Sequence, residues 1–169
     1  MNLENEKIIF LDIDGVLNVI EQGRDEFGQI FHQHFMDNLG FIIDNTGAKS
    51  VISSSWKASG VEYLRKMWKH RNIPGEIIGT TPFAEQVVNS NIHAGAHYDE
   101  IGRGHEIQHF IEEHNVKKYC IIDDDADMLS HQFDNFVFTY GNTDHLDCVD
   151  IGYGLTRYCA MQAIVILNR

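Results

Sequence analysis

The sequence predicts a three-layer α/β fold in which helices cover both faces of a parallel β-sheet. Short apolar runs alternate along the chain with helical patterns, which is typical of βαβ units. The runs lack the polar alternation of half-exposed strands, so both faces of each strand should be buried. We expect one domain over residues 1–169, because this length suits a single core.

In the first half of the chain, three apolar runs predict strands. Residues 7–11 (KIIFL) end at the acidic sequence DIDG, and Val51-Ile52 ends at Ser53-Ser54-Ser55. Residues 76–80 (EIIGT) are a third, shorter candidate. Between the last two strands lies a helical pattern formed by Val61, Leu64, Met67 and Trp68.

The second half repeats the alternation. A helical pattern covers residues 105–114, and the apolar residues 119–122 end at Asp123-Asp124-Asp125. Residues 136–140 (FVFTY) are a further strand candidate. The chain closes with a predicted helix over 154–167, whose shared face should hold Leu155, Tyr158, Cys159, Ala163 and Ile166.

Charge and cysteine content narrow the class of protein. The net charge of −12 weighs against binding nucleic acid through a global field, although a local basic patch is compatible with it. Three cysteines without a C-x-x-C pair suit a reducing compartment. The start of the chain has no apolar leader and no run long enough to span a bilayer, so we expect a cytoplasmic protein without membrane partners.

Three predicted strands end in oxygen-bearing side chains. In parallel sheets ligands bind at the carboxyl ends of strands, so Asp12 and Asp14, Ser53 to Ser55, and Asp123 to Asp125 should converge on one crevice. Carboxylates packed together repel one another unless a cation intervenes. An open site with only oxygen ligands favours Mg²⁺.

Such a crevice has the groups needed for phosphoryl transfer. A metal ion neutralises phosphate charge, and a carboxylate can attack phosphorus to form an aspartyl-phosphate. A serine hydroxyl and a side-chain cation would complete the cradle for the transferred group.

These strand ends resemble the motifs of the haloacid dehalogenase (HAD) superfamily. FLDIDGVLN at 10–18 is similar to its motif I, VISSSWK at 51–57 to motif II, and YCIIDDDADM at 119–128 to motif IV. Together with RGHEI and a late GLT, they most resemble the HAD domain of Swiss Army knife RNA-repair proteins and its stand-alone relatives. The resemblance implies a Rossmann-like fold. Residues 18–48 and 81–102 would supply only small flaps, which leaves a minimal cap.

The resemblance also implies residue roles. Asp12 would be the nucleophile and a metal ligand. Asp14 would be the acid for the leaving group and then the base for water, with its backbone carbonyl on the metal. In motif IV, Asp124 would be the metal ligand, supported by Asp123 or Asp127.

Each of two phosphate-binding roles has two candidate residues. Ser54 is the first candidate for binding the phosphoryl oxygen and Ser53 is the second. The usual motif III lysine is replaced by Arg103, whose planar fork suits phosphate, and Lys57 competes for the role.

The resemblance therefore predicts a Mg²⁺-dependent phosphatase acting on a phosphorylated substrate, with polynucleotide ends as one candidate. The alternative is a non-catalytic module that binds a phosphorylated ligand. An open site suits a bulky substrate by analogy. A basic helix face in this acidic chain could track a phosphate backbone, although a solvated face is the plainer interpretation; its residues are Lys57, Arg65, Lys66, Lys69 and Arg71.

A third reading starts from HEIQH at 105–109, which matches the H-E-x-x-H pattern of zinc peptidases. We expect His105 and His109 to lie on the solvent side of their helix, and no third ligand follows in sequence. A second pair, His93 and His97, is interpreted as loop histidines. A zinc peptidase is accordingly the least favoured function.

Overall fold

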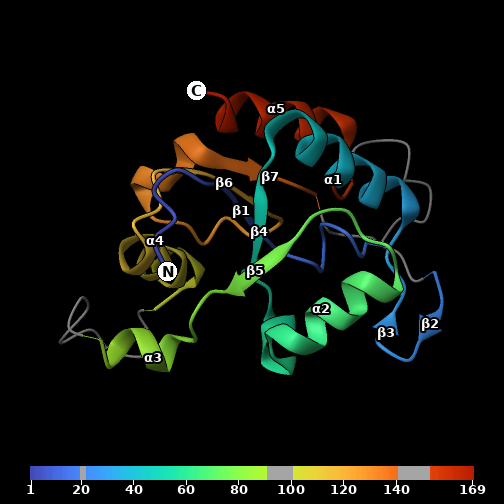
Figure 1. Cartoon of the computed structure of the whole chain (residues 1–169), viewed down its shortest axis with the longest axis horizontal. Coiled ribbons are helices and arrows are strands. Elements are labelled where there is room, and N and C mark those ends of the chain that lie inside the picture. Colours follow the sequence, from blue (N-terminus) through green and yellow to red (C-terminus); the bar gives the residue numbers. More distant parts are fainter. Residues whose placement is uncertain (20–21, 91–100, 141–152) are drawn as a thin grey trace.

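A computed structural model describes residues 1–19, 22–90, 101–140 and 153–169, and its centre is a five-stranded parallel sheet (Figure 1). The strand order is β5-β4-β1-β6-β7, and every neighbouring pair is parallel. The strands are β1 (Lys7–Leu11), β4 (Lys49–Ile52), β5 (Ile77–Thr80), β6 (Lys118–Asp123) and β7 (Phe136–Phe138).

Strand β1 lies at the point where the winding of the sheet reverses. From β1 the chain moves outward through β4 and β5, then returns to β6 and β7 on the other side. Leu11 consequently has Ile52 as its partner on one side and Ile122 on the other. In open α/β sheets the crevice at such a reversal is where ligands bind.

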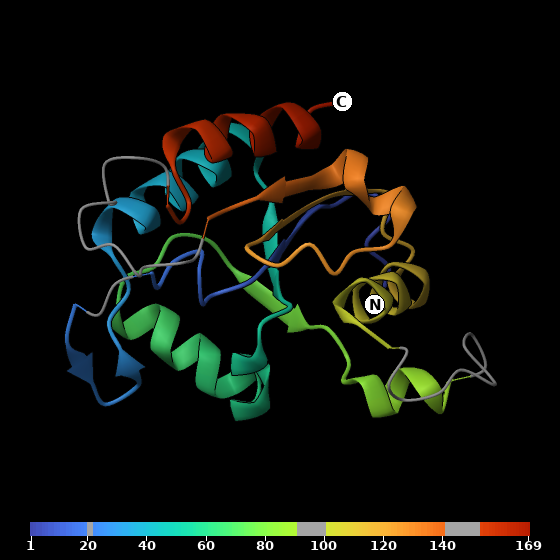
Figure 2. The same cartoon turned by 180° about the vertical axis from the view of Figure 1, so that it is seen from behind.

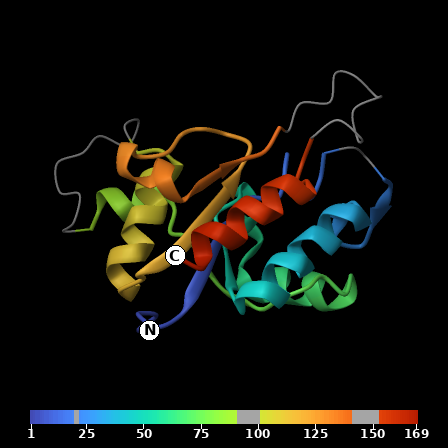
Figure 3. The same ribbon diagram turned by 90° about the horizontal axis from the view of Figure 1, so that it is seen from above.

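Helices cover both faces of the sheet, as the sequence predicted (Figures 1 and 3). Helices α1 (Gln33–Thr46) and α5 (Arg157–Leu167) pack side by side on one face, and α4 (Arg103–His114) packs on the other. Helix α2 (Val61–His70) packs against β5 at the sheet edge. Smaller elements are the hairpin of β2 (Arg24–Asp25) and β3 (Gly28–Gln29), the short helix α3 (Ala84–Val88), and 3₁₀ helices at Ser55–Ser59 and Ser130–Asn135.

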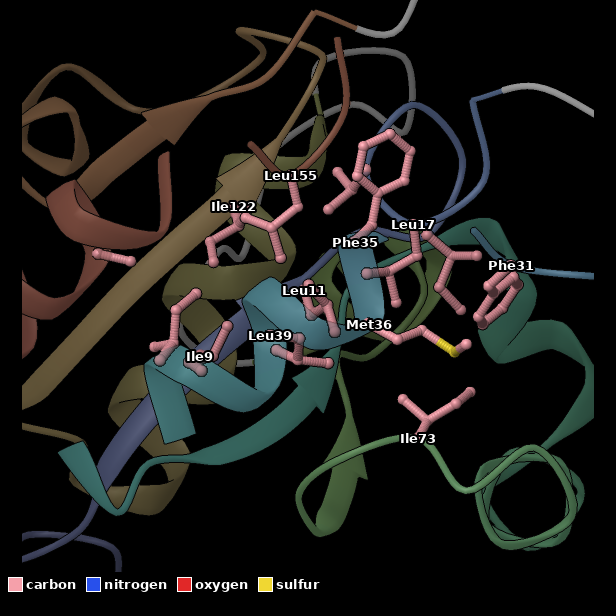
Figure 4. Packing of buried hydrophobic residues seen from close by; sticks show 14 of the residues in the cluster. Ile9, Leu11, Leu17, Phe31, Phe35, Met36, Leu39, Ile73, Ile122 and Leu155 are labelled. Atoms are coloured by element: carbon pink, nitrogen blue, oxygen red, sulfur yellow. The ribbon is translucent and has the colours of Figure 1, made fainter. Parts of the chain in front are cut away.

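The alternation of side chains along the central strands builds two apolar layers. Ile9 and Leu11 of β1 point to the α1 and α5 side, where Phe35 and Leu39 of α1 meet them (Figure 4). Ile8 and Phe10 point to the α4 side. Because both faces of β1 are fully buried, its end is held rigidly where the polar residues begin.

Helix α1 corrects the expectation that residues 18–48 form only a small flap. It places Phe35, Met36, Leu39 and Ile42 in the core, so it belongs to the main layer of the fold. It ends at Gly47, which adopts a left-handed conformation with φ of 68°. Figure 2 shows α1 beside α5 from the opposite side.

Two details of α5 also matter for the sequence predictions. The helix begins at Arg157 rather than at residue 154, and the predicted face is wrong at Tyr158, whose side chain is exposed. Ala160 and Leu167 are buried alongside Cys159 and Ala163 instead. Cys120 and Cys159 are buried free thiols, and Cys148 lies outside the described residues.

No helix in the described ranges is long and apolar enough to cross a membrane.

Candidate active site

The polar ends of β1, β4 and β6 meet at the carboxyl edge of the sheet. Backbone hydrogen bonds continue past the strands there: Asp12 N donates to Ile122 O at 3.0 Å, and Ser53 N donates to Leu11 O at 3.1 Å. These hydrogen bonds extend the sheet by one residue, so they fix the positions of Asp12 and Ser53 at its edge. The convergence that the sequence predicted is present in the structure.

Three carboxylates form a compact group in this crevice. Asp12, Asp123 and Asp124 each offer an oxygen within 4.8 Å of the others. Gly15 makes room for them, because a Cβ at this position would lie 2.1 Å from Asp124 Oδ2, and its φ of +75° also favours glycine. The position of Gly15 in the D-x-D-G sequence therefore requires a residue without a side chain.

Burial and mutual repulsion make these carboxylates reluctant to ionise. Burial raises the pKa of Asp123 to about 7, and the charge of Asp12 adds to the shift. Burial likewise raises the pKa of Asp12 and of Asp124. A group of acids with raised pKa values gains stability from a bound cation.

Arg103 supplies one positive charge to this group. Its Nη1 donates to Asp12 Oδ1 at 2.6 Å and to Asp123 Oδ2 at 3.1 Å. Burial acts to lower the pKa of Arg103, but the charges of Asp123 and Asp12 outweigh it and raise the pKa. Arg103 thus stays protonated and links the ends of β1 and β6.

The start of α4 fixes Arg103 in this place. Asp127 Oδ2 accepts a hydrogen bond of 3.0 Å from Arg103 N, and Gly104 N donates to Asp127 O at 2.9 Å. A Cβ at Gly104 would come within 2.6 Å of Leu129 N. Asp127, which was one of two candidates for supporting the metal ligand, therefore holds the helix N-terminus against the loop after β6.

Asp14 lies outside the three-carboxylate group, and its exposed side chain is held by two donors. Trp56 Nε1 donates to Asp14 Oδ2 at 2.9 Å, and Asn18 Nδ2 donates to Asp14 Oδ1 at 2.9 Å. Its carboxylate is thus oriented at the rim of the crevice, where it faces solvent. The predicted contact of its backbone carbonyl with a metal stays a prediction.

The two candidate serines differ in their partners. Ser54 is fully buried, and its hydroxyl forms a hydrogen bond with Asp12 that acts to lower the pKa of Asp12. Ser53 is also buried, but among the described residues its Oγ has no hydrogen-bond partner. Ser54 thus lies beside the predicted nucleophile, whereas Ser53 keeps an unused hydroxyl.

Lys57 is buried, and protein groups surround its ammonium. Its Nζ donates to Glu106 Oε2 at 2.5 Å, to Thr81 Oγ1 at 3.1 Å and to Pro82 O at 2.9 Å. Burial lowers the pKa of Lys57, and the hydrogen bond with Glu106 opposes that effect. With three donors engaged, Lys57 ties the 3₁₀ helix to α4, while Arg103 faces the carboxylates.

The donor set fits a divalent cation. All three potential ligands are carboxylate oxygens, and a bound cation would offset the burial and mutual repulsion that raise their pKa values. Asp12, Asp123 and Asp124 would hold the ion. When bound, Mg²⁺ supplies charge neutralisation to a phosphoryl group at this position.

The two other candidate sites gain no support. The carboxylate group is the only cluster of three or more potential metal ligands within the described ranges, so His105 and His109 have no third ligand there. His109 is also more buried than expected, with 13% of its side chain exposed, since α3 packs against α4. His93 and His97 lie outside the described residues.

The basic residues on and beside α2 are only partly exposed. Arg71 pairs with Asp25 of the β2–β3 hairpin at 2.7 Å, and Arg65 Nε donates to Ile77 O at 2.9 Å. Lys57 is buried and Arg71 is half-buried, so Arg65, Lys66 and Lys69 are the exposed members of the set.

The comparison with known families agrees with this geometry. A family model for the HAD domain in Swiss Army Knife RNA repair proteins matches residues 8–144. The chain belongs to this family. Among curated proteins, no significant match to the chain is found. Membership of the HAD superfamily indicates a phosphatase-type hydrolase, and HAD domains typically use Mg²⁺, which suits the acidic group described above.

Sequence reasoning missed three side chains of this HAD site. Trp56 and Asn18 orient Asp14, and Glu106 anchors Lys57. Asn18 follows Asp14 by four residues, so a local turn was a usable signal. Trp56 and Glu106 reach their partners across 42 and 49 residues, and no sequence period reports such contacts.

Proposed function

We propose that this HAD domain is a Mg²⁺-dependent phosphomonoesterase that works through an aspartyl-phosphate on Asp12. The observation that carries the proposal is the contact between Asp12 and Arg103 inside a group of three carboxylates. A phosphoryl group beside Asp12 would have the Arg103 guanidinium and the Ser54 hydroxyl as donors for its oxygens.

The roles of the chain's residues follow from their positions. Asp12 attacks phosphorus, the bond to the leaving oxygen breaks, and Asp14 donates a proton to that oxygen. Asp14 then accepts a proton from the water that hydrolyses the aspartyl-phosphate. Trp56 and Asn18 hold the carboxylate of Asp14 for both steps. Polynucleotide ends are among the candidate substrates.

The test is release of phosphate from an aryl phosphate by the purified protein in the presence of Mg²⁺. We expect turnover that Asp12→Asn abolishes and that Asp44→Asn retains, because Asp44 is an exposed residue of α1 outside the carboxylate group and its crevice. Tight binding of phosphate without turnover in the wild-type protein would refute the proposal in favour of a ligand-binding module.

A further inference from the structure

A cavity of about 470 Å³ adjoins the carboxylate crevice. The two share Ser55, Arg103 and Asp125 on their walls. A group attached to a phosphoryl oxygen at Arg103 can therefore extend directly into this cavity. Its size lies within the roughly 300–1,000 Å³ that small-molecule sites occupy.

One wall of the cavity carries an exposed aromatic ring. Phe83 lines the cavity beside Ala58 and Ile101, and 44% of its surface is exposed. The Lys57 ammonium lies 4.9 Å from the centroid of the ring. Because Lys57 also binds the carbonyl of Pro82, the residue before Phe83, the ring is held in place at the cavity. A fixed exposed ring of this kind can stack on a planar group without a large loss of side-chain entropy.

One of the residues that line the cavity has an unsatisfied hydroxyl. Ser53 is 1% exposed, lines the cavity, and its Oγ has no partner among the described residues. Buried polar groups are nearly always hydrogen-bonded, so this hydroxyl needs a partner from a bound molecule or solvent. A ligand with ring and sugar heteroatoms can provide one, whereas a plain phenyl ring cannot.

The charges of the cavity limit it to an uncharged group. Glu106, Asp125 and Asp127 line it, and the Lys57 ammonium is already engaged by Glu106 and Thr81. A second phosphate would meet these carboxylates and be repelled. The cavity thus suits the neutral part of a monophosphate whose single phosphate lies at Arg103.

We propose that this cavity is a leaving-group subsite for one nucleoside unit of a phosphomonoester, with Phe83 as the specificity-determining residue. The inference rests on the proposed phosphatase function. The nucleobase stacks on Phe83, and the nucleoside supplies the hydrogen-bond partner of Ser53. We expect recognition to centre on the nucleotide that carries the phosphate, because Phe83 and Arg103 line the same cavity.

The test compares kcat/KM for adenosine monophosphate, as the 3′ and 5′ isomers, with kcat/KM for glycerol 2-phosphate and phenyl phosphate. We expect Phe83→Ala to lower the ratio of the nucleotide value to the glycerol phosphate value about tenfold, the scale of one base-stacking contact. Phe83→Trp should restore the ratio. The matched control is Phe133→Ala, which removes a similarly exposed ring outside this cavity and should leave the ratio unchanged.

An unchanged ratio in Phe83→Ala would overturn the subsite, as would a wild-type preference for phenyl phosphate over both nucleotides. Absence of turnover on every phosphomonoester would refute the phosphatase function but not the subsite. In that event calorimetry decides: the subsite requires adenosine monophosphate to bind the wild-type protein more tightly than inorganic phosphate, and this advantage to disappear in Phe83→Ala. Equal affinities would overturn it.

Discussion

Trp56 Nε1 donates a hydrogen bond of 2.9 Å to Asp14 Oδ2, which joins the segment after β4 to the segment after β1. The second oxygen of Asp14 is held by Asn18 at the same distance. Asp14 is therefore oriented before any substrate arrives, on the open side of the crevice. An acid that is held in one orientation transfers its proton more effectively than one that samples many.

Trp56→Phe should lower kcat/KM, which reports the phosphoryl-transfer step in which Asp14 is the acid, because it removes one of these two donors while keeping a large ring. The loss of one hydrogen bond to a charged group predicts a decrease of about tenfold for an alkyl phosphate. The decrease should be smaller for an aryl phosphate, whose leaving group needs less help from an acid. Steady-state kinetics with both substrates measures the difference.

The matched control is Trp68→Phe. The indole of Trp68 donates a hydrogen bond to Pro74 O at 3.3 Å in the core, and not to an acidic residue of the site. This variant should affect stability and leave the relative rates on the two substrates alone. Equal losses on both substrates in Trp56→Phe would show that Trp56 only supports the fold.

A second prediction concerns Lys57 and Glu106, whose side chains are 5% and 13% exposed. Removal of one member of a buried pair leaves the other charge unpaired, so Lys57→Met should lower the free energy of unfolding by about 3–5 kcal/mol. The double variant Lys57→Met with Glu106→Leu should recover a substantial part of that loss. Urea denaturation measures all three proteins.

This double variant separates two roles for Lys57. If Lys57 is structural, the double variant regains phosphatase activity together with stability. A double variant that is stable but inactive would instead return Lys57 to the phosphate-binding role that the sequence left open.

The third prediction concerns metal binding and thermal stability. A ligand that binds only the folded state at about a hundred times its Kd stabilises that state by about 2.7 kcal/mol. For a chain of this size, saturating Mg²⁺ should then raise Tm by roughly 5–10 °C. Asp124→Asn should lose most of this increase, and Asp44→Asn, at an exposed position of α1 outside the crevice, should keep it. An increase of Tm that survives in Asp124→Asn would place the metal elsewhere.

The fourth prediction is a dependence of stability on pH in the metal-free protein. Because burial raises the pKa of Asp123 from 3.8 to about 7, the folded state holds more protons than the unfolded state between about pH 4 and pH 7. Stability contributed by this group is present below that window and is lost as pH rises through it. The measurement compares the free energy of unfolding of Asp123→Asn with that of the wild type, with a chelator present to remove metal. The excess of the variant over the wild type should grow as pH rises through the window. A constant difference would contradict the raised pKa.

The main strands of the sheet were predictable because each is marked by the residues within and directly after it. Each of β1, β4 and β6 contains buried apolar residues directly before a polar cluster, although in β4 these are only Val51 and Ile52. The strand order was not predicted, but the carboxyl ends of parallel strands share one edge of the sheet, so the meeting of Asp12 with Asp123 and Asp124 was expected.

Helix α1 was missed for an identifiable reason. Its buried residues Phe35, Met36, Leu39 and Ile42 do follow a helical period, but Gly40 and several Asn and Asp residues dilute the pattern. Packing against α5 and the sheet stabilises a helix that intrinsic propensity alone does not favour.

The side chains that tune the site could not be found from sequence. The Trp56–Asp14 bond and the Lys57–Glu106 pair each depend on how a short 3₁₀ helix docks against distant segments. Such contacts follow from tertiary packing, for which the sequence carries no period or spacing.

The most direct test of the account is to trap the phosphoryl group on Asp12. In Asp14→Asn, an aryl phosphate needs little acid to leave, but hydrolysis of the aspartyl-phosphate lacks its base. Acid-quenched Asp14→Asn should therefore carry a phosphoryl group on Asp12, identified by peptide mass spectrometry, at close to one per chain. Turnover by the wild type with no phosphorylated Asp12 in either protein would contradict nucleophilic attack by Asp12.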